Sequence, residues 1–337
     1  MKKVSFSNGM KKFFTSWEFV LTMILLAEVI IFATKNPKFL MPRVLLGSLN
    51  DIMSICYISL FVTFVMVTGG IDIQAGSIVG LTSIVIGVAW QDGGMNIWTA
   101  ALLAILISAL CGAMSGYFVA YCGVQPMVVT LGGSFLFSGI ALLVSNLSAT
   151  ESYKGISGFP DSFTQLTKIK LFDVLPLQVI IFLVLAIFAN WLLTKTKYGR
   201  EITLIGVNKQ AAEYSGINAK GIEMSAYILS AVSASIAGII LTSYLNTAKS
   251  DIGATLTMPI ITAVVLGGTL STGGKGSVAG TALAAIIIGV LKFGLPLCFK
   301  VSQQYLDIPV GLVLLAVVIT RSVFSNPQVI AKMHRKS

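Results

Sequence analysis

The residue in this sequence with the clearest capacity for chemistry is a carboxylate in apolar surroundings, Asp72. It lies in the stretch TGGIDIQAGS at 68–77, with two glycines before it and Gly76 and Ser77 after it. Glycines tolerate unusual backbone angles, so they favour a break in regular structure here. A carboxylate away from water is costly unless it is hydrogen-bonded. Two roles fit: Asp72 caps backbone N–H groups freed by a break, or it lines a pathway and binds a polar solute.

The other reactive side chains do not form a catalytic or metal-binding pattern. The single histidine, His334, lies in a basic tail, and Lys275 lacks the neighbours of a phosphate-binding loop. The cysteines occur singly in or beside apolar segments, without a C-x-x-C pair: Cys56, Cys111, Cys122 and Cys298. The sequence therefore predicts no enzymatic activity, no metal site, no cofactor and no ATP site on this chain.

The composition is that of a membrane protein. Of the 337 residues, 55% are hydrophobic and only 11% are charged, whereas a soluble chain carries about 25% charged residues. The run 93–150 contains no charged residue at all, and it is long enough for two spans of about 20 residues each. We therefore predict an all-α, polytopic integral membrane protein that forms a single transmembrane domain over 1–337.

About ten transmembrane helices are expected. The apolar segments lie at 17–35, 44–68, 74–91, 97–121, 125–146, 174–194, 223–245, 257–273, 277–297 and 305–324. An even count places both termini on one side, and both tails, 1–16 and 325–337, are basic. Because basic segments remain in the cytoplasm, we expect both tails and the basic loop 195–222 to be cytoplasmic. The same rule explains the net charge of +10 without nucleic acid as a partner.

Glycines interrupt a second apolar stretch in a similar way. Residues 67–80 and 265–280 both read V-x-G-G, a short insert, and then G-S-x-x-G. Paired glycine interruptions in the two halves of a membrane protein are typical of a transport pathway lined by broken helices. The candidate residues for a pathway or helix break are Gly69, Gly70, Asp72, Gly76, Ser77, Gly267 and Gly268. The sequence leaves open whether the two stretches form a true repeat.

Three further glycine pairs have the four-residue spacing that lets membrane helices approach closely. They are Gly76 with Gly80, Gly112 with Gly116, and Gly276 with Gly280. We interpret each pair as a site of helix packing.

The loop 195–222 contains a short helical pattern. Asn208 is a good N-cap, the residues after it are mostly helix-compatible, and Gly216 is a natural stop. A helix of about two turns is too short to be stable alone, so we expect it to dock onto something. The alternative is a loop that contains one turn of helix and no partner.

This segment carries a resemblance to a known family. Residues 210–216, QAAEYSG, resemble the E-A-A-x-x-x-G motif of ABC importer permeases, with Gln210 in place of the glutamate. TGGIDIQAGS and the surroundings of 195–217 resemble the ribose-type sugar permeases. Three segments, 158–163, 243–254 and 258–268, are similar to the D-type permease subunits of autoinducer-2 importers and to rhamnose permeases. The residues that match the coupling-helix motif or flank it are Asn208, Gln210, Ala211, Ala212, Glu213 and Gly216.

The resemblance implies a permease subunit in the bacterial inner membrane, embedded in lipid. It implies an ATP-binding cassette ATPase as partner, a second and different permease subunit, and an extracytoplasmic solute-binding protein. The implied substrate is a small sugar-like solute, autoinducer-2, with rhamnose or ribose as alternatives. An ion-coupled secondary transporter is a rival, although the spans offer few ionisable groups. A channel or receptor would not need the 195–222 loop.

Overall fold

A computed structural model describes residues 17–171, 175–299, 301–302, 305–306, 308–313 and 315. Both predicted tails and most of the expected tenth span, 305–324, lie outside the described residues.

Helices make up nearly all of the regular structure in the part of the chain that the structure describes, as predicted. The long helices are α2 (Trp17–Lys35), α3 (Pro42–Val67), α4 (Ala75–Gln91), α5 (Ile97–Ala120), α6 (Pro126–Ser145), α8 (Leu177–Lys195), α11 (Ala219–Leu245) and α13 (Val278–Phe299). Shorter helices are η1 (Pro37–Leu40), α7 (Asp161–Thr164), α9 (Lys197–Val207), α10 (Lys209–Tyr214) and α12 (Thr257–Leu266). Each of the first nine expected segments therefore contains a helix.

Two small antiparallel sheets join the loops at one end of the bundle. In the first, β1 (Ile156–Ser157) pairs with β4 (Thr247–Ala248), and Ile156 lies opposite Ala248. In the second, β2 (Lys170–Leu171) pairs with β3 (Leu175–Pro176). The segment after α11 is thereby tied to the loop between α6 and α8.

Among the residues that the structure describes, six helices are long and apolar enough to cross a membrane: α2, α5, α6, α8, α11 and α13. α12 has only ten residues, so it extends about 15 Å, half of the roughly 30 Å hydrocarbon core. The expected segment 257–273 therefore does not form one continuous helix, and α12 ends at the glycines named as candidate break residues. Gly267 follows α12 directly, and Gly268 has a φ of +103°, an angle that a helix cannot contain.

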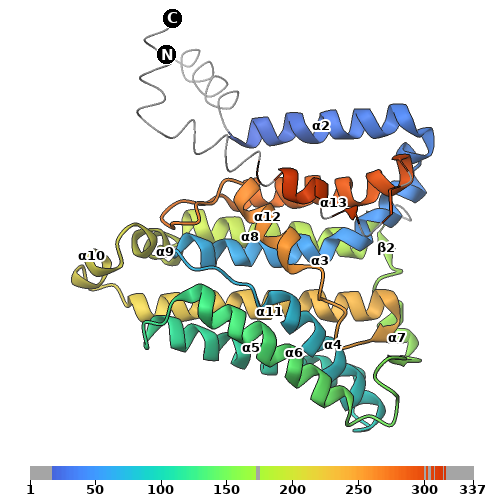
Figure 1. Cartoon of the computed structure of the whole chain (residues 1–337), viewed down its shortest axis with the longest axis horizontal. Coiled ribbons are helices and arrows are strands. Elements are labelled where there is room, and N and C mark those ends of the chain that lie inside the picture. Colours follow the sequence, from blue (N-terminus) through green and yellow to red (C-terminus); the bar gives the residue numbers. More distant parts are fainter. Residues whose placement is uncertain are drawn as a thin grey trace, which may run out of the picture.

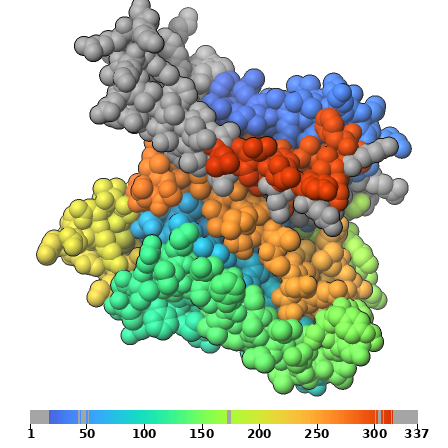
Figure 2. Space-filling model, viewed as in Figure 1, coloured from blue at the N-terminus to red at the C-terminus, as the bar shows by residue number. Residues whose placement is uncertain are grey.

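The helices run roughly side by side in one bundle (Figure 1). α2 and α13 form one edge and α4, α5 and α6 the opposite edge, while α9 and α10 protrude at one end. Figure 2 shows α5 and α6 at the surface, where Leu110, Phe135 and Leu143 are each at least two-thirds exposed. Such side chains suit contact with lipid tails or another apolar surface.

One of the three glycine pairs packs two helices together as expected. A β-carbon at Gly112 would lie 2.6 Å from the Tyr227 carbonyl oxygen, and one at Gly116 would lie 2.9 Å from Met224 Cα, so α5 and α11 are in close contact. Gly76 and Gly80 of α4 instead contact the backbone of the turn 250–253, so this pair packs a helix against a turn and not against a second helix. The third interpretation is wrong, because Gly276 precedes α13 and does not share a helix with Gly280.

Candidate coupling segment and helix breaks

The segment between α8 and α11 folds as two short helices that protrude from the bundle (Figure 1). Asn208 separates α9 from α10, and its side-chain oxygen accepts a hydrogen bond from Ala211 N at 3.0 Å. The predicted N-cap is thus confirmed. α10 has six residues, slightly fewer than the two turns expected.

Gly216 ends α10 in the way its residue type predicts. Its φ is +80°, in the left-handed region that glycine adopts without a steric penalty. Ile217 N donates to the Ala212 carbonyl at 3.1 Å, and Gly216 N donates to the Glu213 carbonyl at 3.0 Å. These two bonds form a Schellman motif, so the helix has a defined end despite its short length.

α10 has an inner and an outer side. Ala212 is only 4% exposed and packs with Ile205 of α9 and Ala219 of α11. Tyr214 is 93% exposed. The other motif residues on the outer side are Gln210, Ala211, Glu213 and Gly216. Ala212 therefore holds α10 against the bundle, and a partner would meet the residues around it.

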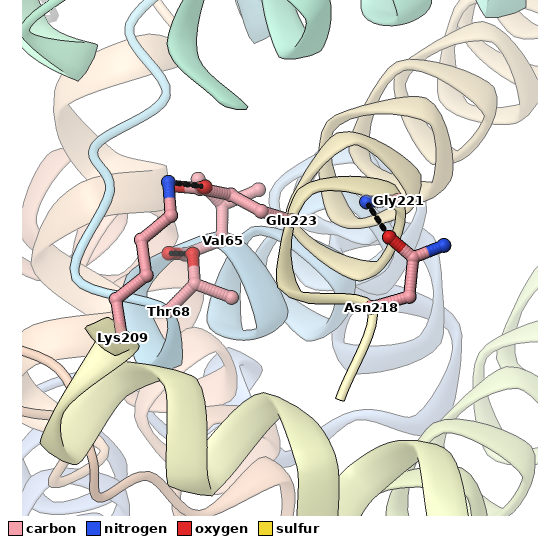
Figure 3. Close-up of polar contacts among 6 residues, drawn as sticks. All are labelled: Val65, Thr68, Lys209, Asn218, Gly221 and Glu223. Atoms are coloured by element: carbon pink, nitrogen blue, oxygen red, sulfur yellow. Dashed lines mark hydrogen bonds and ion pairs between the residues drawn. The ribbon is translucent and has the colours of Figure 1, made fainter. Parts of the chain in front are cut away.

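An ion pair connects α10 to the long helix α11. Lys209 Nζ lies 2.5 Å from Glu223 Oε2, and the Glu223 side chain is only 8% exposed. Asn218 caps the same end of α11 by accepting a hydrogen bond from Gly221 N at 3.1 Å. Figure 3 shows Lys209 reaching toward Glu223, with the cap on the first turn of α11. α10 is therefore fixed in position relative to a helix that runs through the bundle.

Sequence reasoning missed this ion pair and an apolar patch on α9. The two charges are 14 residues apart, on different helices, so no helical spacing signals their pairing. Leu204 and Val207 of α9 are more than half exposed. The available signal was the three-residue spacing of Gly199, Ile202 and Ile205, which face inward and leave Leu204 and Val207 on the other side.

The first break comprises residues 68–74, between α3 and α4. Its backbone groups are satisfied by side chains from other elements, as irregular backbone at membrane depth requires. Thr130 of α6 donates to the Ile71 carbonyl at 2.9 Å, and Thr257 of α12 donates to the Ile73 carbonyl at 3.4 Å. The predicted helix break is thus present, and α4, α6 and α12 meet around it.

Asp72 lies inside the protein rather than at a wet interface. It is 1% exposed, so the carboxylate is away from water. Its Oδ1 accepts from Gln74 N at 3.0 Å, and its Oδ2 accepts from Ser230 Oγ of α11 at 2.6 Å. The carboxylate therefore satisfies an N–H of the break itself and joins the break to α11, while α4 begins only at Ala75.

Further buried polar groups surround Asp72. Gln74 Oε1 accepts a hydrogen bond from Ser115 Oγ at 2.7 Å. Gln74 Nε2 and the Tyr227 hydroxyl have no hydrogen-bond partner among the described residues. Gly70 is close to that hydroxyl, because a β-carbon there would overlap it. Two buried donors thus remain available beside the carboxylate.

Ser77 takes part in a chain of hydroxyl groups between α4 and α6. Its Oγ lies 2.9 Å from Ser134 Oγ and accepts from Ser138 Oγ at 2.9 Å. Ser138 is exposed, whereas Gly76, next to Ser77, is buried against Gly253. The hydroxyl chain therefore joins α4 to α6, with Ser77 and Ser134 half-buried and Ser138 exposed.

The second break comprises residues 267–277, between α12 and α13. Gly267 packs against α13, since a β-carbon there would overlap Thr281 N, and Gly268 turns the chain. The break then reaches the end of α3, where Gly274 N donates to the Val67 carbonyl at 2.8 Å. The structure thus brings the two glycine-rich stretches together at one end of the bundle, although they lie in different halves of the sequence.

The chain shares extensive similarity with known permeases. A family model described as "Branched-chain amino acid transport system / permease component" matches residues 44–318. The autoinducer 2 import system permease protein LsrD of Klebsiella pneumoniae is 39% identical over 91% of this chain and 92% of its own length. The proteins of that name from Salmonella typhimurium and Yersinia pseudotuberculosis are 40% and 41% identical over 91% of this chain, and over 92% and 91% of their own lengths.

One solved structure shows a weaker likeness. It is described as PsaBC from Streptococcus pneumoniae in complex with Fab, with a TM-score of 0.47 and 12% identity, over 87% of this chain and 95% of that one.

The family match covers most of the chain, and the relatives align over nearly their whole length. The apolar helices agree with a protein that crosses the membrane several times. The chain belongs to the family of branched-chain amino acid transport system permease components, and it is a permease subunit of an ABC-type importer.

Proposed function

We propose that this subunit carries autoinducer-2 across the bacterial inner membrane, driven by ATP hydrolysis on a partner ATPase. The observation that carries the proposal is the 39% to 41% identity to permeases named for autoinducer 2 import, over about nine-tenths of each chain. A motif shared by all such permeases would not produce similarity of this extent. The import machinery would also include a second, different permease subunit and an extracytoplasmic solute-binding protein.

The outer side of α10 supports docking of the ATPase. The helix is capped at both ends, held to α11 by an ion pair, and exposes Tyr214 almost fully. Large aromatic side chains on a rigid element are typical anchors of protein interfaces. Docking here would place the 195–222 loop in the cytoplasm, together with both tails, and residues 1–337 would form one permease domain in the lipid bilayer.

The break residues support a polar route through the protein. The hydroxyl chain from Ser77 to Ser138 and the two unpaired donors near Asp72 are groups that bind hydroxylated solutes. A second permease subunit packed on the outer face of α6 would enclose the hydroxyl chain. The glycines at 69, 70, 76, 267 and 268 then serve the close backbone packing around this route.

Uptake by a strain that lacks its own autoinducer-2 permeases tests the proposal. Expression of this chain with its ATPase, second permease and binding protein should restore uptake of labelled autoinducer-2. TGGIDIQAGS favours ribose as a second candidate, and the segments similar to rhamnose permeases favour rhamnose, so each sugar is offered as a competitor. Uptake of a sugar in preference to autoinducer-2 would mean that the sugar is the substrate. Uptake that follows an ion gradient without ATP would refute the ATP-driven mechanism.

A further inference from the structure

Three segments from distant parts of the sequence meet at the end of the bundle that carries α10. They are the C-terminal turn of α9, the junction of α3 with the first break, and the turn at 272–274 in the second break. Gly274 N donates to the Val67 carbonyl at 2.8 Å, which joins the two breaks. Gly206 of α9 lies against this same hydrogen bond.

The contact at Gly206 is between backbones, with no space for a side chain. A β-carbon at Gly206 would overlap both the Val67 carbonyl oxygen and the Gly274 amide nitrogen. One at Gly273 would lie 2.7 Å from Gly69 N and 3.1 Å from the Gly206 carbonyl oxygen. Contacts this close make the three segments a single packed unit, since atoms at van der Waals contact transmit displacement rather than absorb it.

The backbone angles at this junction also require glycine. Gly69, Gly273 and Gly274 have φ values of +90°, +84° and +77°, in the region where other residues are strained. The adjacent residue, Val207, contacts Gly274 and is 70% exposed. α9 thus has one side on the two breaks and another side open for a partner, next to α10.

We propose that Gly206 is the positioning residue through which movement of the α9–α10 segment reaches both helix breaks at once. The inference rests on the proposed docking of an ATPase to this segment. When the ATPase displaces α10, α9 moves with it, because Asn208 and the Ala212 packing link the two helices. The shared contact at Gly206 then shifts residues 68–70 and 272–274 together, so the two sides of the solute route change in one step.

Gly206→Ala tests the contact directly. The added methyl group separates α9 from Val67 and Gly274 but leaves the outer side of α10 unchanged. We expect the ATPase subunit to remain bound in the purified complex. ATP-driven uptake should fall roughly tenfold, the size of effect typical of residues on a coupling route. Gly132→Ala in α6 is the matched control, because a β-carbon there meets nothing within 4 Å. Normal uptake by an assembled Gly206→Ala complex would overturn the inference.

A second measurement keeps the inference testable if Gly206→Ala does not assemble. Spin labels are placed on Val207→Cys and Thr272→Cys, both exposed positions on either side of the junction, with the native cysteines replaced. Their separation is measured in the assembled complex without nucleotide and with ATP retained by the ATPase. Each label is also measured against one on Leu102→Cys, an exposed position of α5. Movement as one unit is supported if both distances to α5 shift with ATP while the mutual separation stays constant, and any other result overturns it. Failure of the ATPase to co-purify with the unaltered chain would instead refute the proposed function.

Discussion

Replacement of Asp72 separates a structural role from a transport role. The carboxylate is fully buried and accepts two hydrogen bonds, from Gln74 N and from Ser230 Oγ. Leucine at position 72 is larger than aspartate and accepts neither bond. Asp72→Asn keeps an oxygen for Gln74 N, and its amide can donate to the Ser230 oxygen when that hydroxyl turns.

The number of hydrogen bonds lost sets the expected change in the free energy of unfolding for each variant. Asp72→Leu leaves two buried donors without partners, and each unsatisfied group costs about 1–3 kcal/mol, so the loss of stability is roughly 2–6 kcal/mol. Asp72→Asn exchanges a charged acceptor for a neutral one and keeps both bonds. Its cost is about 1 kcal/mol, the typical net value of one hydrogen bond. Asp72→Leu is therefore expected to be several times more destabilising.

Thermal unfolding in detergent and uptake in proteoliposomes measure the two roles separately. If Asp72 fixes the first break, Asp72→Asn retains most of the uptake, and Asp72→Leu loses both uptake and stability. The reasoning is refuted if Asp72→Asn abolishes uptake while the complex remains folded and assembled. In that case the charge itself serves transport, and the unpaired Gln74 amide and Tyr227 hydroxyl nearby become candidate solute contacts.

Further predictions concern the coupling segment and the topology. Tyr214→Ala should weaken the binding free energy between this chain and the ATPase by about 2 kcal/mol, the scale of an interface anchor. The melting temperature of the chain should not change, and undiminished co-purification of the ATPase would exclude Tyr214 as a contact. Ala212→Arg should disturb the fold of α9 and α10 and the docking of the ATPase, because a charged side chain replaces a buried methyl group. If the variant resists limited proteolysis and co-purifies with the ATPase as well as the unaltered chain does, the inward packing of Ala212 is contradicted. Reporters fused at Lys168 and Lys209 should lie on opposite sides of the membrane, and the same side for both would mean that α8 does not cross it.

Much of the fold could be predicted from the composition and from the residues that begin and end helices. Long uncharged runs indicated the spans, and Asn208 and Gly216 marked the ends of α10 because capping depends on local residue type. The apolar segment 257–273 continues past α12, whose end at Gly267 and Gly268 was indicated only by the glycines. Hydropathy measures preference for lipid and does not report where backbone hydrogen bonding stops.

The site was harder to predict because its contacts join distant segments. The burial of Asp72 depends on Ser230, which is 158 residues away, and the inward direction of Ala212 depends on Ile205 and Ala219. Similar glycine patterns at 67–80 and 265–280 suggested corresponding elements in two halves. In the structure Gly69 of the first stretch packs against Gly273 of the second, whereas Gly70, Gly76 and Gly80 contact other elements. Sequence similarity between two segments does not reveal whether they are equivalent or in contact.

ATP-driven uptake by the reconstituted complex tests the central claim most directly. The chain, its ATPase, second permease and binding protein are placed in vesicles, and labelled autoinducer-2 is followed with and without ATP on the ATPase side. The account predicts accumulation only with ATP, loss of accumulation when Tyr214→Arg prevents docking, and no dependence on an ion gradient. Accumulation that continues without ATP, or that is unaffected by Tyr214→Arg, would contradict it.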